Sequence, residues 1–323
     1  MRVHTYFRIP IVTIVLGTIF SFQSAALGRP NNGFDLSNLT VPKRLLKTGL
    51  PDRDGIPSIN RPIFTHIDSA SYLRPTDRVL GVVIGGVPKA YPIKILDHHE
   101  IVNDKVGSQH FVVTYCPLCG SGMSFEVNEG QAKTFGVSGL LYNSDVLLYD
   151  RETESLWSQI AMESVAGPLA GSKLKPIPTI DTTWQAWTKR HPTTLVLSNR
   201  QGIYHPQAYE NELYPGYNDN NRILFPIRKR SKQLKPKELV IGLELNGLRK
   251  AYPLRELANE DSPLLDKFAG HTLKIHFDND SQSAIILDKN DKVIPSTRMY
   301  WFAWYAFKPE TEVYESPSTT EKK

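Results

Sequence analysis

The sequence predicts a β-rich α+β protein in which one hairpin–helix–hairpin unit occurs twice, with a segment of mixed character between the two copies. Short runs rich in β-branched and aromatic residues alternate with turn residues, as in sheets built from hairpins. The segment VLGVVIGGVPKAYPIKIL (79–96) is matched by VIGLELNGLRKAYPLREL (240–257) at a constant offset. A second pair of strand-like runs follows each of these segments.

The first 28 residues have the pattern of a secretory signal. Arg2 and Arg8 lie near the N-terminus, an uncharged apolar run follows, and small residues come next. Cleavage is expected after Ala26 or after Gly28. The apolar run is shorter than the roughly 20 residues that span a bilayer, although an uncleaved anchor is the alternative. We therefore expect an exported protein, periplasmic or extracellular, with an N-terminal extension at 29–67 and no other membrane span.

Each copy is expected to begin with a tight hairpin. The dipeptides Gly85–Gly86 and Asn246–Gly247 tolerate positive φ and are strong signals of a two-residue turn. Pro92 and Pro253 follow the return strands and suit the first position of a helix, where the missing N–H costs nothing. Short helices are predicted at 92–102 and 253–258.

A second hairpin follows in each copy, so that the copies extend over about 79–127 and 240–288. In the first copy the strands HFVVTY and MSFEV flank CPLCGSG, which contains both cysteines of the chain, Cys116 and Cys119. In the second copy HTLKIHF and QSAIILD flank a turn at Asp278–Asp280. Because this scaffold closes the same turn without cysteines, the Cys-x-x-Cys of the first copy is interpreted as an added chemical feature.

Between the copies, strands are predicted at 133–141, 146–150 and 193–198. A helix is predicted over Thr182–Arg190, where Thr182 and Gln185 have the spacing of a capping box. Trp184 and Trp187 share one face of that helix and are expected in the core. The duplicated domain is expected to span 68–310, with a polar tail at 311–323.

Cys116 and Cys119 can form half of a metal site. Two thiolates leave a tetrahedral ion short of ligands, and the neighbouring candidates are His99, His98 and Met123. Two thiolates, an imidazole and a thioether form a soft donor set, which favours copper, whereas zinc fits equally well without Met123. The leading hypothesis is an exported metal-binding protein of unassigned reaction that holds a copper or zinc ion.

Two other functions remain open for the same cysteines. A thiol–disulfide oxidoreductase uses Cys-Pro-x-Cys at the start of a helix, but here Gly120 and Gly122 follow, and glycine disfavours a helix. A non-catalytic interaction protein with a structural disulfide is the third reading, since export favours oxidation. A disulfide across so short a loop would restrict the unfolded chain only modestly.

Several function classes are not supported by the sequence. It contains no P-loop, no dinucleotide fingerprint and no His-Glu-x-x-His motif, so no nucleotide cofactor is expected. The formal net charge of +5 is modest, and no basic motif with interleaved aromatic residues indicates nucleic-acid binding. Partners, substrate and any enzymatic activity are not specified by these patterns.

The motifs together resemble one known family. Lys-Ala-Tyr-Pro is followed by His99-Glu-x-Val-Asn-Asp, by Cys116-Pro-Leu-Cys119-Gly, by Phe135-Gly-Val-Ser-Gly and by Leu148-Tyr-Asp-Arg. This order resembles the exported bacterial proteins grouped as domain of unknown function 3179, over roughly residues 68–310. The resemblance implies kinship without an assigned reaction, and it implies that His99, rather than His98, matches the histidine of the family.

Overall fold

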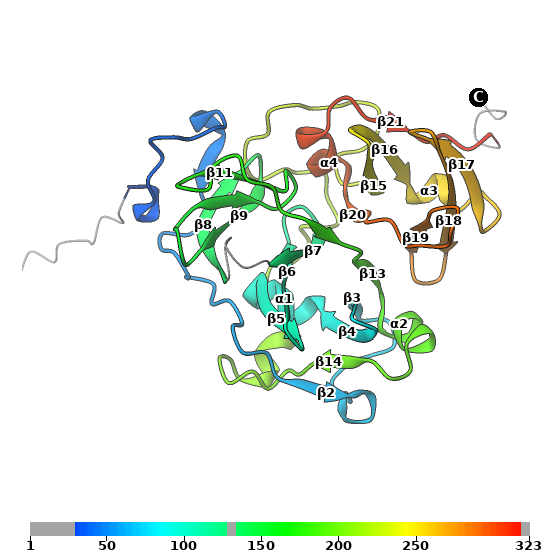
Figure 1. Ribbon diagram of the computed structural model, residues 1–323, viewed down its shortest axis with the longest axis horizontal. Coiled ribbons are helices and arrows are strands. Elements are labelled where there is room, and N and C mark those ends of the chain that lie inside the picture. The colour runs from blue at the N-terminus through cyan, green and yellow to red at the C-terminus, as the bar shows by residue number, and fades with distance from the viewer. Residues whose placement is uncertain (1–29, 128–133, 318–323) are drawn as a thin grey trace, which may run out of the picture.

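The computed structural model describes residues 30–127 and 134–317, which form five small sheets arranged like the blades of a five-bladed propeller (Figure 1). The expectation of a β-rich fold with few helices is confirmed. Within the described ranges, no helix is both long and apolar enough to cross a membrane. The segment expected to be a signal lies outside these ranges.

The sheets differ in size and are built mainly from antiparallel neighbours. The first, in spatial order, contains β1 (Leu46–Thr48), β8 (Phe135–Tyr142), β9 (Asp145–Asp150), β10 (Leu156–Ser158) and β11 (Glu163–Ala166). The second contains β12 (Pro176–Ile177), β7 (Ser121–Val127), β6 (Gln109–Cys116) and β5 (Ile101–Val106). The third contains β13 (Ile180–Thr183), β3 (Arg78–Ile84), β4 (Val87–Pro92), β14 (Leu195–Leu197) and β2 (Phe64–His66).

Two further sheets lie in the C-terminal half. The fourth contains β20 (Thr297–Tyr300), β15 (Leu239–Leu245), β16 (Leu248–Pro253) and β21 (Glu312–Val313). The fifth contains β17 (Leu264–Phe268), β18 (His271–Asp278) and β19 (Ser283–Leu287). The α-helices are α1 (Ile93–His99), α2 (Trp184–Arg190), α3 (Leu254–Leu257) and α4 (Trp301–Phe307). Short 3₁₀ helices cover Pro30–Gly33, Lys43–Leu45, Ile67–Ser69 and Pro206–Glu210.

The two predicted tight turns are confirmed. Gly85 and Gly86 have φ of 55° and 81°, and Asn246 and Gly247 have φ of 52° and 76°. Positive φ at both central residues gives the turn the twist of its flanking strands. The pairing registers of the two hairpins also agree, because Val79 lies opposite Pro92 in β3–β4 and Val240 lies opposite Pro253 in β15–β16.

The Lys-Ala-Tyr-Pro segment fixes each hairpin to the strand that follows its helix. Lys89 Nζ and Tyr91 Oη both donate to Oδ2 of Asp104, each at 2.5 Å, and all three side chains are buried. The corresponding contacts of the second segment join Lys250, Tyr252 and Asp266. A buried lysine needs such a partner, since an unpaired buried charge is costly. This requirement explains why the lysine, the tyrosine and the aspartate recur together.

Both short helices begin one residue later than predicted. Pro92 and Pro253 are the N-cap residues of α1 and α3 and precede the first helical position. The capping box predicted at Thr182 and Gln185 is wrong, because α2 begins at Trp184 and its cap is Thr183, whose Oγ1 accepts a hydrogen bond from the Ala186 N–H. Thr182 is the penultimate residue of strand β13, and its hydroxyl donates to Ser283 Oγ.

Tryptophans from α2 and α4 cover glycines in the two central strands. Trp187 packs on Gly81 in β3, and Trp304 packs on Gly242 in β15. The indole N–H of Trp187 donates to Thr194 Oγ1, and that of Trp304 donates to Thr311 Oγ1. The prediction that Trp184 and Trp187 lie in the core is confirmed. A glycine is required beneath each ring because a Cβ would lie about 2.2 Å from it.

Segments outside the two matched regions, 79–127 and 240–288, also contribute strands to the sheets. From the predicted N-terminal extension, β1 pairs with β8 and β2 pairs with β14. The start of the predicted polar tail forms β21, which pairs in parallel with β16. The strands predicted at 133–141, 146–150 and 193–198 correspond to β8, β9 and β14. Both β8 and β9 belong to the first sheet.

Candidate metal centre

The two cysteines lie at the tip of the β6–β7 hairpin, as predicted. Cys116 ends β6 and lies opposite Ser121, and the four residues between them form the turn. The Cys119 N–H donates to the Cys116 carbonyl at 3.2 Å, and Gly120 closes the turn with a φ of 59°. A left-handed residue at this point suits glycine, so the Cys-x-x-Cys-Gly pattern sets a turn that directs both sulfurs inward.

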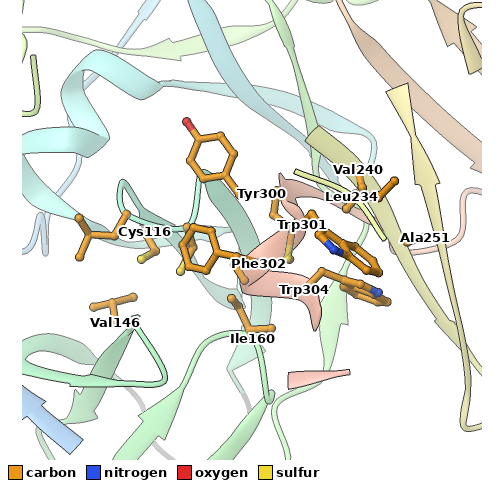
Figure 2. Packing of buried hydrophobic residues seen from close by; sticks show 14 of the residues in the cluster. Cys116, Val146, Ile160, Leu234, Val240, Ala251, Tyr300, Trp301, Phe302 and Trp304 are labelled. Atoms are coloured by element: carbon orange, nitrogen blue, oxygen red, sulfur yellow. The ribbon is translucent and has the colours of Figure 1, made fainter. Parts of the chain in front are cut away.

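Strand β20 and the segment that carries Tyr217 hold this loop in place. The Tyr300 N–H donates to the Cys119 carbonyl at 2.9 Å, and the Tyr217 hydroxyl donates to the Leu118 carbonyl at 2.9 Å. Figure 2 shows Cys116 among the apolar side chains of the surrounding cluster, with Val146 and Phe302 around it. Cys116 and Cys119 are 1% and 0% exposed. The two sulfurs are therefore held in place by the surrounding chain and shielded from water.

The structure adds a candidate ligand that the sequence reasoning missed. Asp145, the first residue of β9, brings a carboxylate oxygen to within 4.8 Å of both sulfurs, and this trio is the one group of three or more His, Cys, Asp or Glu ligands that residues 30–127 and 134–317 assemble. It follows the tight turn Asn143–Ser144, whose φ values of 57° and 71° reverse the chain between β8 and β9. An acidic residue directly after a two-residue turn was the available signal.

Only one oxygen of the Asp145 carboxylate accepts hydrogen bonds from the described residues. Its Oδ2 accepts from the Ile160 N–H at 3.0 Å and from the Ser158 hydroxyl at 3.4 Å. Its Oδ1 is buried and has no hydrogen-bond partner in the described part of the chain. Beside it, the thiol of Cys119 donates to the Ser144 carbonyl at 3.3 Å. A buried acceptor without a partner is costly, so this oxygen is available to a ligand.

Burial disfavours the charged forms of all three groups. It raises the pKa of the Cys116 thiol and raises that of Cys119 well above its usual value. Burial also raises the pKa of Asp145 to about 7, although the N–H groups of Ile160 and Val146 oppose this shift. Because three adjacent buried anions repel one another, a cation is the natural means of stabilising their deprotonated forms.

His99, predicted as a ligand, is not brought into this group. Its Nδ1 donates to the Pro57 carbonyl at 2.6 Å, which fixes the neutral tautomer, and its Nε2 then accepts from the Tyr209 hydroxyl at 2.8 Å. Both ring nitrogens are therefore engaged, and the side chain is 0% exposed. Its role in this structure is to connect α1 to the segments carrying Pro57 and Tyr209.

The two remaining candidates also lie in other surroundings. Met123 packs in a separate core cluster with Ile101 and Phe125, whereas the cysteines belong to the cluster of Trp301 and Trp304. His98 packs edge-on against Tyr204 and Tyr209. Its Nε2 is buried without a hydrogen-bond partner in the described residues. The thioether that favoured copper is thus part of the packing between two sheets.

Replacing His99 with glutamine is expected to change how stability depends on pH. Burial lowers the pKa of His99 to about 4, below the value near 6.5 of the unfolded chain. The contribution of neutral His99 to the free energy of unfolding is therefore complete above pH 6.5 and is lost as the pH falls toward 4. Relative to His99→Gln, the wild type should lose about 2 kcal/mol of unfolding free energy between pH 8 and pH 5.

Urea unfolding of both proteins across this pH range measures the difference, and the other titrating groups cancel in the comparison. Parallel curves would show that His99 titrates as it does in the unfolded chain and would contradict the prediction.

Two cavities flank the cysteine loop. One, of about 330 Å³, is mainly apolar and is lined by Leu118, Val146 and Glu100. Glu100 is 7% exposed, its side chain has no hydrogen-bond or ion-pair partner among the described residues, and burial raises its pKa to about 8. The other, of about 450 Å³, has several charged side chains in its lining, is called the polar cavity below, and reaches the loop at Pro117 and Gly120. The centre therefore lies between an apolar and a polar space.

The comparisons with known proteins give one result. The model of a family described as "Protein of unknown function (DUF3179)" matches residues 53–311, which include Cys116, Cys119 and Asp145. A search of curated proteins finds no significant match, and a search of solved structures finds none either. The matched range covers most of the chain and confirms the suspected kinship. The chain belongs to the DUF3179 family.

Proposed function

We propose that this protein binds one metal ion through the sulfurs of Cys116 and Cys119 and the carboxylate of Asp145. The observation that carries the proposal is the approach of these three ligand atoms to within 4.8 Å of one another inside the core. The unpartnered Oδ1 of Asp145 adds to it, since a bound cation would satisfy this atom. Three protein ligands leave one position of a tetrahedral ion open, as in sites that bind a water or a substrate.

Zinc suits this donor set better than copper does. A carboxylate is a harder ligand than the thioether or imidazole that a copper(I) site favours, and zinc accepts sulfur and oxygen together. Met123 and His99, on which the copper hypothesis depended, make other contacts. We therefore name Cys116, Cys119 and Asp145 as the ligands, and leave the reaction unassigned.

Thiol–disulfide exchange is less well supported. The attacking group in that chemistry is an exposed thiolate with a lowered pKa, commonly at a helix N-terminus. Here burial raises the pKa of both thiols, neither is accessible, and Cys116 ends a strand. A disulfide between the two sulfurs is retained as an outcome of the test.

Elemental analysis of protein purified from its own compartment tests the proposal, with free thiols counted on the same sample after unfolding and chelation. We expect about one zinc ion per chain and two free thiols. Protein that contains no metal and no free thiol would replace the metal site with a disulfide. One copper ion per chain would keep the site and change the ion.

Removing the ion is expected to lower stability. A ligand that binds only the folded chain stabilises it by about 4 kcal/mol when its concentration is a thousandfold above its Kd. Dialysis against a chelator should therefore lower the unfolding midpoint, and added zinc should restore it, whereas magnesium should not. An unchanged midpoint in metal-depleted protein would contradict folding-coupled binding.

Two wider features belong to this proposal. The first 28 residues combine a basic start, an apolar run and small residues, and this pattern supports export. The site would then work outside the cytoplasm. The two matched segments agree in strand register, in their lysine–tyrosine–aspartate contacts and in their tryptophan–glycine contacts. This agreement supports duplication of one unit. In register, Cys116 corresponds to Asp278, so the second copy closes the same turn without cysteines.

A further inference from the structure

The polar cavity of about 450 Å³ is lined by charged side chains, only some of which pair with one another. It lies where α1, β3, β6, β20 and the segment before β15 meet, and it touches the cysteine loop at Pro117 and Gly120. Cations and carboxylates both line it. No ion pair among the described residues joins the carboxylate of Asp97 or Glu212 to a lysine or an arginine.

One side of the cavity has an excess of positive charge. The guanidinium groups of Arg78 and Arg298 share a single carboxylate, that of Asp181, at 2.6 and 3.1 Å. Arg298 donates one hydrogen bond through Nη1, and its Nε is buried without a partner in the described residues. Lys237, 8% exposed, donates to the Tyr217 carbonyl and lies over that ring, but it has no carboxylate partner among them.

The side contributed by α1 has an excess of negative charge. Lys94 is shared by two carboxylates, Asp77 at 3.1 Å and Glu210 at 2.7 Å. Asp97 and Glu212 also line the cavity and have no hydrogen-bond or ion-pair partner in the part of the chain that the structure describes. Proximity to Glu212 adds to burial in raising the pKa of Asp97 to about 7. A cation placed between these two carboxylates would relieve their repulsion.

A third polar group faces the same space. Tyr115 lines the cavity, is 9% exposed, and its hydroxyl has no hydrogen-bond partner among the described residues. It interacts electrostatically both with Asp97 on the acidic side and with Arg298 on the basic side. A nine-tenths buried phenol normally bonds to a partner. Here a ligand lying between the two charged sides would supply that partner.

We propose that this cavity binds a small dipolar molecule that carries both an ammonium group and a carboxylate, of the amino-acid or short-peptide class. The carboxylate contacts Arg298, with Lys237 nearby, because these are the cations without full compensation. The ammonium group lies near Asp97 and Glu212, and Tyr115 bonds to the polar atoms between. The cavity is of the size that encloses small ligands, and its convergent polar groups set the orientation. The proposal goes beyond the metal site and does not depend on it.

Isothermal titration at low ionic strength tests this with the dipeptide L-alanyl-L-alanine and two forms of it that each lack one charge. Acetylation removes the ammonium group, and amidation removes the carboxylate. We expect a saturable isotherm with a Kd below about 1 mM for the dipeptide. Each single-charge form should bind at least about tenfold more weakly, as the loss of one charged hydrogen-bonded pair implies.

Three variants locate the binding. Arg298→Gln and Glu212→Gln should each weaken dipeptide binding about tenfold. Tyr115→Phe removes one oxygen that has no hydrogen-bond partner among the described residues. It should weaken binding about threefold and leave the unfolding midpoint unchanged or higher. Arg255→Gln, which removes an exposed guanidinium outside the cavity, should have no effect.

The outcomes decide the proposal. Equal affinity of the dipeptide and its acetylated form would replace a dipolar site with an anion site and overturn it. The absence of saturable binding, or unchanged affinity in all three cavity variants, would also overturn it. Zinc content serves as an independent readout, since it should be the same in Tyr115→Phe and in the wild type.

Discussion

Replacing Asp145 with asparagine is expected to remove bound metal from the protein, from about one ion per chain to less than about a tenth. Asparagine keeps the shape of the side chain and can still accept from the Ile160 N–H, but its neutral oxygen is a much weaker ligand for zinc. The free variant should be as stable as the free wild type, because the substitution also removes the cost of burying a carboxylate. Metal content and unfolding midpoint, measured on the same preparation, separate lost binding from lost folding.

Two variants serve as matched controls. His99→Gln and Met123→Leu change the other candidate ligands, and both should retain the ion, since His99 bonds to Pro57 and Tyr209 and Met123 packs in another core cluster. If either variant lost the metal while Asp145→Asn kept it, the ligand set proposed here would be wrong.

Cys119→Ser tests the same site through a different ligand. It should also lose the ion, because one thiolate and one carboxylate make a poor cage for zinc. A thiol–disulfide oxidoreductase would behave differently, since the remaining Cys116 would trap partner proteins as mixed disulfides. Wild-type protein without metal, together with trapped partners in Cys119→Ser, would favour the oxidoreductase over the metal site.

Replacing Gly242 with alanine is expected to cost about 3 kcal/mol of unfolding free energy. The added Cβ would lie 2.2 to 2.7 Å from three ring atoms of Trp304, far inside the usual contact distance of about 3.5–4.0 Å. The ring has little freedom to move, because it is 4% exposed and its N–H donates to Thr311 Oγ1. Strand and helix would have to separate, so the whole sheet should be affected.

Gly81→Ala should behave in the same way, since its Cβ would lie 2.2 to 2.6 Å from ring atoms of Trp187. Gly49→Ala is the control, because the nearest atoms to its Cβ are at 3.1 Å and belong to the flexible side chain of Leu141. It should cost less than about 1 kcal/mol. Chemical unfolding compares the three variants, and similar losses at Gly49 and Gly242 would show that the tryptophan contact is not the cause.

The candidate centre depends on the meeting of three sheets. The cysteine loop comes from the β6–β7 hairpin, Asp145 from β9 in the first sheet, and the peptide N–H that holds Cys119 comes from Tyr300 in β20. Each sheet therefore supplies one part of the site. A change that shifts one sheet relative to another, such as the two glycine substitutions, is expected to disturb the centre without touching a ligand.

The sequence by itself determined the features that local sterics control. The turns at Gly85–Gly86 and Asn246–Gly247 were predictable because few residues accept positive φ at both positions. The cysteine turn was predictable for a related reason, since Gly120 permits the reversal that places Cys116 and Cys119 together. Repetition of Lys-Ala-Tyr-Pro marked the two matching hairpins, and the structure then shows that each buried lysine pairs with an aspartate.

Only the tertiary structure decided which distant groups meet. Residue spacing assigns a side chain to a face of its own element, but it does not say which other element covers that face. For that reason His99, close to the cysteines in the sequence, bonds instead to Tyr209, while Asp145 reaches them from another sheet. The arrangement of five sheets and the charges of the polar cavity follow from the same long-range packing, which brings together residues that no local pattern connects.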